Sequence, residues 1–186
     1  FDVSTYEREN GHYYIAAPPF RKQSDLAYLW MALEQGVIDV VATDHCPFTI
    51  EQKEMGGGLY PKTPNGLPGV ETLFSLLYSQ GVEKERLSLG KLVKLIAEEP
   101  ARLFGLFPQK GCIMPKADAD LVIFDPNGKA QIKVENLHSN TDWSPYEGIE
   151  TVGTIESVML RGKWLLLNNE LQNDNLLKGR FIPALI

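Results

Sequence analysis

The chain has 186 residues, 44% of them hydrophobic and 23% charged, a composition that can bury a core and excludes wholesale disorder. Its 18 Lys and Arg against 24 Asp and Glu give a net charge of −6, which argues against binding nucleic acid or an anionic membrane, because both need clustered positive charge. No apolar run approaches the ~20 residues of a membrane span, and no signal peptide opens the chain. The two cysteines, Cys46 and Cys112, are expected to be reduced thiols in a cytoplasmic protein.

The first part of the chain alternates between strand and helix patterns. Residues 13–17 (YYIAA) predict a short buried strand that the following prolines end. Ser24 is a candidate N-cap for a helix with one apolar face, which Gly36 ends. Residues 37–43 (VIDVVAT) are β-branched and apolar, which is typical of a strand buried on both faces. The order predicts one β/α unit and the beginning of the next.

A long loop-like segment, residues 44–67, separates this unit from the next helices. It contains three consecutive glycines and several prolines, so we expect residues 56–66 to be mobile, because they have little to bury. A helix follows from Pro68 to Gly81, and another begins after Ser88. A short helical turn then runs from Pro100 to Gly105. The glycine triplet lacks the spacing of a phosphate-binding loop and is interpreted as a hinge.

The pattern changes to strands after about residue 111. Strands are predicted over residues 119–124, 130–134, 152–160 and 163–167, with turns at 161–162 and 168–169. We therefore expect two domains: an α/β part over residues 1–108 and an antiparallel β part over residues 109–186. Because the chain starts with Phe rather than Met, it is expected to be a piece of a longer protein.

Asp44 is the most informative polar residue, because it directly follows the predicted strand 37–43. The carboxyl ends of strands carry the active sites of α/β barrels, where a carboxylate binds a metal or acts as a base. The alternative is an Asp that caps the next turn. His45 should face the opposite way, as a hydrogen-bonded loop residue. Cys46 is a soft metal ligand by type, but the following Pro47 and Phe48 favour packing.

The set of possible ligands is too small for a complete metal site. Only His12, His45 and His138 are present, and none has the spacing that presents two imidazoles to one metal. Metal sites usually need three or four protein ligands, so either the protein is not a metalloenzyme or the other ligands lie on absent sequence. Asn65 with Gly66 indicates a turn whose carbonyl could contact a ligand. Trp143 is a candidate anchor for its loop.

Several motifs together resemble one family. YYIAAPPFR, VVATDHCPFTIEQKEMG and KTPNGLPGVETLFSLLY, followed by AEEPARLFGLFPQKGCIMPKADADLVIFDP, TDWSPYEG and TVGTIESVMLRGKW, are similar in this order to hydantoinases and dihydropyrimidinases, which are cyclic amidohydrolases. DHCPF with NGLPGVE is specific to that family, whereas ADADLVIFD occurs across the wider amidohydrolase superfamily. Allantoinase is the alternative within it.

The resemblance implies the C-terminal portion of a (β/α)8 TIM-type barrel followed by strands of an antiparallel β-sandwich. It implies a homotetrameric enzyme that hydrolyses a cyclic amide and holds two divalent metal ions, with zinc as the expected metal. Asp44 would ligate one metal and move the proton to the leaving nitrogen, while Asn65 and Ala17 would contact the substrate through their backbones. Ala17 stands where relatives often have Ser, and Leu73 where dihydropyrimidinases often have Arg. The family's remaining metal ligands are absent, so this chain alone should hold no metal pair.

Two classes of function remain open. The first is a metal-dependent cyclic amidohydrolase of which this chain is a part. The second is a non-catalytic scaffold or assembly protein that keeps the fold without the metals. Asp44 favours the enzyme, and the upstream sequence would discriminate the two, since an enzyme needs an H-x-H pair and the metal-bridging lysine there.

Overall fold

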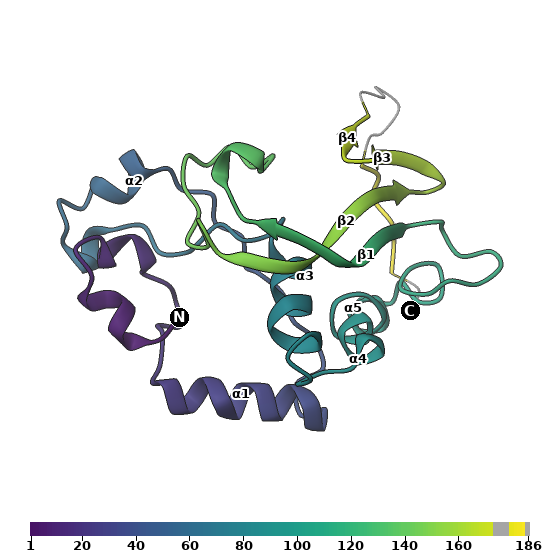
Figure 1. Cartoon of the computed structure of the whole chain (residues 1–186), viewed down its shortest axis with the longest axis horizontal. Helices are drawn as coiled ribbons and strands as arrows, with labels where there is room; N and C mark the ends of the chain where they lie inside the picture. Colours follow the sequence, from purple (N-terminus) through teal and green to yellow (C-terminus); the bar gives the residue numbers. More distant parts are fainter. Residues whose placement is uncertain (173–178, 185–186) are drawn as a thin grey trace. The chain divides into compact units, whose positions relative to one another are not determined.

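The structure is a computed structural model that describes residues 1–172 and 179–184 (Figure 1). The chain forms two compact units, each built from several stretches of sequence. Unit 1 comprises Phe1–Val37, Ala42–Leu76 and Gln131–Thr151, and unit 2 comprises Ile38–Val41, Leu77–Ala130 and Val152–Ile186. The division at 108/109 that the sequence predicts stays a prediction.

Unit 1 opens with aromatic turns instead of the predicted strand. The residues YY of the expected strand 13–17 lie in the 3-10 turn Gly11–Tyr14, so that prediction is wrong. The turn serves to bury Tyr14, whose ring contacts Phe1 and Trp143 edge-on. The Arg8 guanidinium lies over the Tyr14 ring, 5.6 Å from its centroid. Aromatic packing, rather than a strand ladder, therefore organises this part.

Helix α1 (Gln23–Gln35) confirms the predicted helix, with a different cap. The Asp25 carboxylate accepts the backbone N–H of Lys22 at 3.0 Å, so the cap comes from Asp25 and not from Ser24. Gly36 ends the helix in the left-handed conformation at φ 74°, as expected. Leu33 is buried, whereas Leu29 of the same predicted apolar face is half exposed.

The predicted strand 37–43 does not form among the described residues. One backbone hydrogen bond, from the Val41 N–H to the Leu95 carbonyl at 3.1 Å, holds the part Ile38–Val41 within unit 2. An apolar β-branched run becomes a strand only where neighbouring strands pair with it, and no described strand lies alongside. The prediction of a strand buried on both faces is therefore wrong here, and Val37 is 72% exposed.

The segment 44–67 contains a helix that the sequence analysis missed. Thr49 caps helix α2 (Ile50–Glu54) by accepting the Gln52 N–H, and the Gln52 side chain returns a bond to the Thr49 N–H. A 3-10 turn follows at Tyr60–Lys62, and Thr63 is buried. Several hydrogen bonds tie residues 56–66 to α2 and to their own turns, although only Gly56 and Thr63 among them are buried, and the expected mobility stays a prediction.

Two helical runs follow. Helix α3 (Leu73–Leu77) continues into a π-helical turn at Tyr78–Val82, so the helix predicted from Pro68 starts later. In unit 2, α4 (Leu89–Val93), a π-helical turn at Lys94–Glu98 and α5 (Glu99–Leu103) form one continuous run. Ser88 caps it by accepting the Lys91 N–H, as predicted. Leu92 and Leu95, 0% and 1% exposed, form the buried face of this run.

A four-stranded sheet completes the fold, in the order β1-β2-β3-β4 (Figure 1). The strands are β1 (Leu121–Gln131), β2 (Glu150–Leu160), β3 (Lys163–Leu167) and β4 (Glu170–Leu171). Strands β2 and β3 pair antiparallel with Leu160 opposite Lys163, and β3 pairs antiparallel with β4. The predicted strand 130–134 is wrong beyond Gln131, where β1 ends and a 3-10 turn follows at Val134–Asn136.

Both predicted hairpin turns are confirmed. Arg161 and Gly162 have φ of 49° and 76°, and Asn168 and Asn169 have φ of 51° and 65°. Two consecutive positive φ angles are the signature of a two-residue turn whose twist matches that of the flanking strands. No helix in the described part of the chain is long and apolar enough to cross a membrane.

Candidate active site

Asp44 lies at a sharp backbone turn with a free carboxylate. Its φ is 45°, a left-handed conformation that Asp tolerates better than most residues. The residue is exposed, and within the described chain no donor bonds to its carboxylate. The alternative reading, in which this carboxylate caps the following turn, is therefore not what the structure has. A free carboxylate at a turn is available to a metal or to a proton.

His45 is bound to the backbone of the NGLPG segment. Its Nδ1 accepts the N–H of Gly69 at 3.0 Å and that of Val70 at 3.3 Å. Because Nδ1 accepts both bonds, it carries no proton, and the ring serves as an anchor. This confirms the prediction of a hydrogen-bonded loop histidine that does not act with Asp44 as a dyad.

Backbone bonds bring the three predicted site segments together. The Cys46 N–H donates to the Leu67 carbonyl at 3.0 Å, and the Gly66 N–H donates to the Ile15 carbonyl at 2.8 Å. Asp44, Asn65 and Ala17 each lie within two residues of these bonds, and all three are exposed. Three segments that are at least 20 positions apart in sequence thus form one surface within unit 1.

Gly66 is the residue that allows this close approach. Its φ of 118° disfavours any side chain, and a Cβ there would lie 2.5 Å from the Cys46 Sγ. Cys46 is free, and its Sγ donates to the Asp44 carbonyl at 3.3 Å. The thiol therefore packs against the turn, as the residues after it predicted.

Lys53 is the residue of this region that sequence reasoning missed. It is 0% exposed, although it lies in the polar stretch of α2. Its Nζ donates to the carbonyls of Pro64 and Gly66, each at 2.7 Å. Burial lowers the pKa of the Lys53 ammonium to about 8. No sequence signal marks this lysine, because its neighbours in the helix are charged and exposed.

Trp143 anchors its loop, as predicted. The buried indole donates its Nε1–H to the Phe48 carbonyl at 2.8 Å, and the Thr141 hydroxyl donates to the same oxygen at 3.2 Å. Asp142 accepts the N–H of Ile50 at the start of α2. The loop 141–143 therefore fixes the segment that follows DHCPF.

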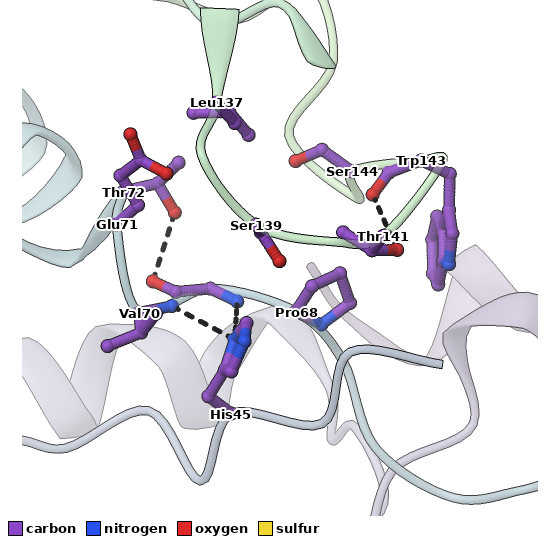
Figure 2. A pocket seen from close by; sticks show the side chains of 11 residues that line it. His45, Pro68, Val70, Glu71, Thr72, Leu137, Ser139, Thr141, Trp143 and Ser144 are labelled. Carbon is purple, nitrogen blue, oxygen red and sulfur yellow. Dashed lines mark hydrogen bonds between the residues drawn. The ribbon is translucent and has the colours of Figure 1, made fainter. Parts of the chain in front are cut away.

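Figure 2 shows a small pocket beside His45, lined by Pro68, Val70 and the loop from Leu137 to Ser144. The Ser139 hydroxyl is buried and has no hydrogen-bond partner among the described residues. At the rim, Glu71 binds His138 twice, through the backbone N–H at 2.8 Å and the ring Nδ1 at 2.7 Å. None of the three predicted site residues lines this pocket.

A second polar cluster lies on the 3-10 turn Gly11–Tyr14. The Glu54 carboxylate accepts the Tyr13 hydroxyl and lies 3.3 Å from the His12 Nε2. The hydrogen bond to Glu54 raises the pKa of Tyr13, and the bond from Tyr13 lowers the pKa of Glu54. His12 thus contacts Glu54 of α2 and is not available as a metal ligand together with Asp44.

The described residues do not form a two-metal centre by themselves. No three His, Cys, Asp or Glu side chains in the described ranges lie close enough together to hold a metal ion. Asp44 is one suitable ligand, while His45 and His12 are engaged elsewhere. That the 186-residue chain alone binds no pair of metals stays a prediction.

The chain belongs to the amidohydrolase family, whose model matches residues 4–165. It is 42% identical over 182 residues to the D-phenylhydantoinase of Escherichia coli O1:K1, covering 97% of this chain and 39% of that protein. The structure matches the D-hydantoinase (dihydropyrimidinase) of Thermus sp. with a TM-score of 0.90, 40% identity and coverage of 94% and 38% of the two chains. It also matches the L-hydantoinase (dihydropyrimidinase) of Arthrobacter aurescens, with a TM-score of 0.86, 35% identity and coverage of 92% and 38%.

These matches define what kind of chain this is. It is a mixed α/β chain that corresponds to a portion of hydantoinases and dihydropyrimidinases and spans under two fifths of their length. The family resemblance drawn from the motifs is confirmed. Because enzymes named for opposite stereochemistry match comparably well, the matches do not select D or L substrates.

Proposed function

We propose that the protein containing this chain hydrolyses a cyclic amide or imide of the hydantoin or dihydropyrimidine type. The observation that carries the proposal is the joining of residues 15–17, 44–46 and 65–67 by backbone hydrogen bonds beside a free Asp44 carboxylate. The 42% identity to D-phenylhydantoinase supports the substrate class.

Hydrolysis of such a ring needs a proton carrier. The oxygen of water adds to the ring carbonyl carbon, the bond from that carbon to the ring nitrogen breaks, and a proton reaches the nitrogen. A carboxylate within reach of both atoms can take the proton from the attacking water and return it to the nitrogen. Asp44 fits this role because its carboxylate is exposed and uncommitted among the described residues.

Asn65 and Ala17 are proposed to hold the ring through their backbones. No described residue donates to the Asn65 carbonyl, so it can accept a ring N–H. A backbone contact at residue 17 does not depend on a side chain, so Ala17 can make it as well as a serine. The remaining specificity would come from residues outside this chain.

The cofactor, subunit and compartment proposals concern the whole protein. Two divalent metal ions, with zinc as the expected metal, would activate the attacking water. Asp44 is the one ligand proposed from this chain. The barrel and β-sandwich arrangement, the homotetramer and the cytoplasmic location are likewise proposals that rest on the family. Within the family, allantoinase is the alternative activity.

The test is turnover by the purified complete protein. Hydantoin, 5-phenylhydantoin, dihydrouracil and allantoin would each be incubated with it, and the ring-opened acid measured by chromatography. The control is the same protein after removal of divalent metals. We expect opening of at least one of the first three rings. Opening of allantoin alone would select the alternative activity, and no opening of any ring would favour the scaffold.

A further inference from the structure

Lys53 is buried in a way that calls for an explanation. Its side chain is fully buried, and no carboxylate in the described part of the chain pairs with it. Lysine is rarely buried without a partner, because removing the ammonium from water is costly. Lys53 is nevertheless buried between the segment that follows Asp44 and the segment that contains Asn65. Its side chain should therefore have a role that an apolar residue could not fill.

The contacts of the Nζ atom are directed at one residue. Two of its three N–H groups reach the carbonyls of Pro64 and Gly66, both at 2.7 Å. The residue between these carbonyls is Asn65. The peptide group that precedes Asn65 and the one that follows Gly66 are therefore both fixed to the ammonium, while the Asn65 carbonyl between them has no donor among the described residues.

The surroundings of Nζ hold the ammonium in place. The ring centroids of Phe48 and Trp143 lie 5.5 Å and 5.9 Å away, within the range of cation–π attraction. Trp143 is itself fixed by its bond to the Phe48 carbonyl. The position of the ammonium is thus set by the segment that follows Asp44, and the position of Asn65 is set by the ammonium.

We propose that Lys53 is a positioning residue that fixes the Asn65 backbone, so that its free carbonyl is presented to the substrate ring at a set distance from Asp44. The proposal rests on the proposed function, in which Asn65 contacts substrate. Lys53 touches neither the substrate nor the reacting atoms. It acts by linking the two segments through one buried atom, and a methionine of similar length would fill the space without the link.

The experiment is the kinetics of Lys53→Met in the complete protein on the ring that the wild type opens best. Lys62→Met is the matched control, because Lys62 is exposed and lies in the same segment without a side-chain hydrogen bond. Loss of a contact made equally in ground and transition states raises KM more than it lowers kcat. We expect KM to rise roughly 10-fold or more, with kcat within about threefold, and Lys62→Met to match the wild type.

A second measurement does not depend on activity. The Gly66 amide, bonded to the Ile15 carbonyl, should exchange with deuterium at least about 10-fold faster in Lys53→Met than in Lys62→Met, since local opening exposes it. If Lys53→Met does not fold, Lys53→Arg takes its place. Arginine keeps the charge and the donors but places them differently, so its KM should exceed that of the wild type by roughly threefold or more, and an unchanged KM would refute the positioning role.

The outcomes separate the two proposals. A wild type that opens no ring refutes the proposed function, and with it the role of Asn65 toward substrate. A wild type that turns over, with an unchanged KM and unchanged Gly66 exchange in Lys53→Met, refutes the positioning role alone. A lower melting temperature with unchanged KM also refutes it, because it leaves Lys53 as support for the fold and nothing more.

Discussion

Two lysines in this molecule anchor loops by opposite means. In unit 1, Lys53 binds two backbone carbonyls in a fully buried place, without a carboxylate. In unit 2, the Lys110 ammonium lies 3.0 Å from the Asp118 carboxylate and also binds Asp120. Burial lowers the pKa of Lys53 to about 8. At Lys110 burial acts in the same direction, but the bonds to Asp120 and Asp118 outweigh it and raise the pKa.

The difference teaches what each anchor can supply. Ion pairs near the surface are held by long side chains on both partners and are screened by salt, so they fix a loop loosely. Carbonyls are fixed to the main chain, so an ammonium bonded to two of them defines the backbone between them closely. The ion-pair anchor of Lys110 suits the segment that links α5 to β1. The carbonyl anchor of Lys53 suits a site where a backbone carbonyl must meet a ligand.

The largest effect is expected at Asp44, in the region that Lys53 anchors. Asp44→Asn in the complete protein should lower kcat for ring opening at least about 10²-fold, because the proton carrier is lost. Asp118→Asn, the same change in the region of Lys110, should leave kcat unchanged. Initial rates of ring opening check both, with circular dichroism confirming the folds. Asp44→Asn activity within about tenfold of the wild type would contradict the role.

Removing the buried anchor should cost more stability than any change at an exposed lysine. Lys53→Met leaves the carbonyls of Pro64 and Gly66 buried without a donor, so the free energy of unfolding should fall by about 3 kcal/mol at pH 7. Urea denaturation measures it, with Lys62→Met as the control. Equal midpoints for the two variants would mean that the buried ammonium adds nothing to the fold.

The pH dependence of that stability has a definite sign. The pKa of Lys53 is about 8 when folded and near its ordinary 10.5 when unfolded, so the unfolded chain binds more protons between these values. Stability therefore rises with pH across this window, and the penalty for burying the ammonium is greatest below pH 8. The free energy of unfolding of the wild type minus that of Lys53→Met should increase by roughly 2 kcal/mol from pH 7 to pH 10. A flat difference would contradict the lowered pKa.

The smallest effect is expected at Lys110. Lys110→Met should lower the Tm by less than about 3 °C, because an ion pair whose carboxylates are still 20% and 32% exposed to solvent contributes little. The loss should shrink further in 1 M salt, whereas the loss from Lys53→Met should persist. Differential scanning calorimetry at low and high salt measures both. A large, salt-independent loss at Lys110 would remove the contrast between the two anchors.

Local sequence was sufficient where a few adjacent residues decide the conformation. The cap at Ser88, the left-handed Gly36 after α1 and the turns at 161–162 and 168–169 are as predicted. The motifs also identified the family and directed attention to Asp44, Asn65 and Ala17. Each of these inferences depends on residue types within a short window, which the sequence displays directly.

Tertiary structure decided the features that depend on distant partners. Residues 37–43 have the composition of a buried strand but pair with no described strand, because a ladder needs neighbours that composition cannot supply. His45 could have been a ligand or an anchor by type, and the N–H groups of Gly69 and Val70, some 25 residues away, made it an anchor. Lys53 was not singled out from the sequence, because its carbonyl and aromatic partners, Pro64, Gly66 and Trp143, are brought to it only by the folded chain. The sequence determined which polar and apolar groups were available. Only the folded chain determined which of them are buried and which hydrogen-bond to one another, because those contacts join residues that are distant in sequence.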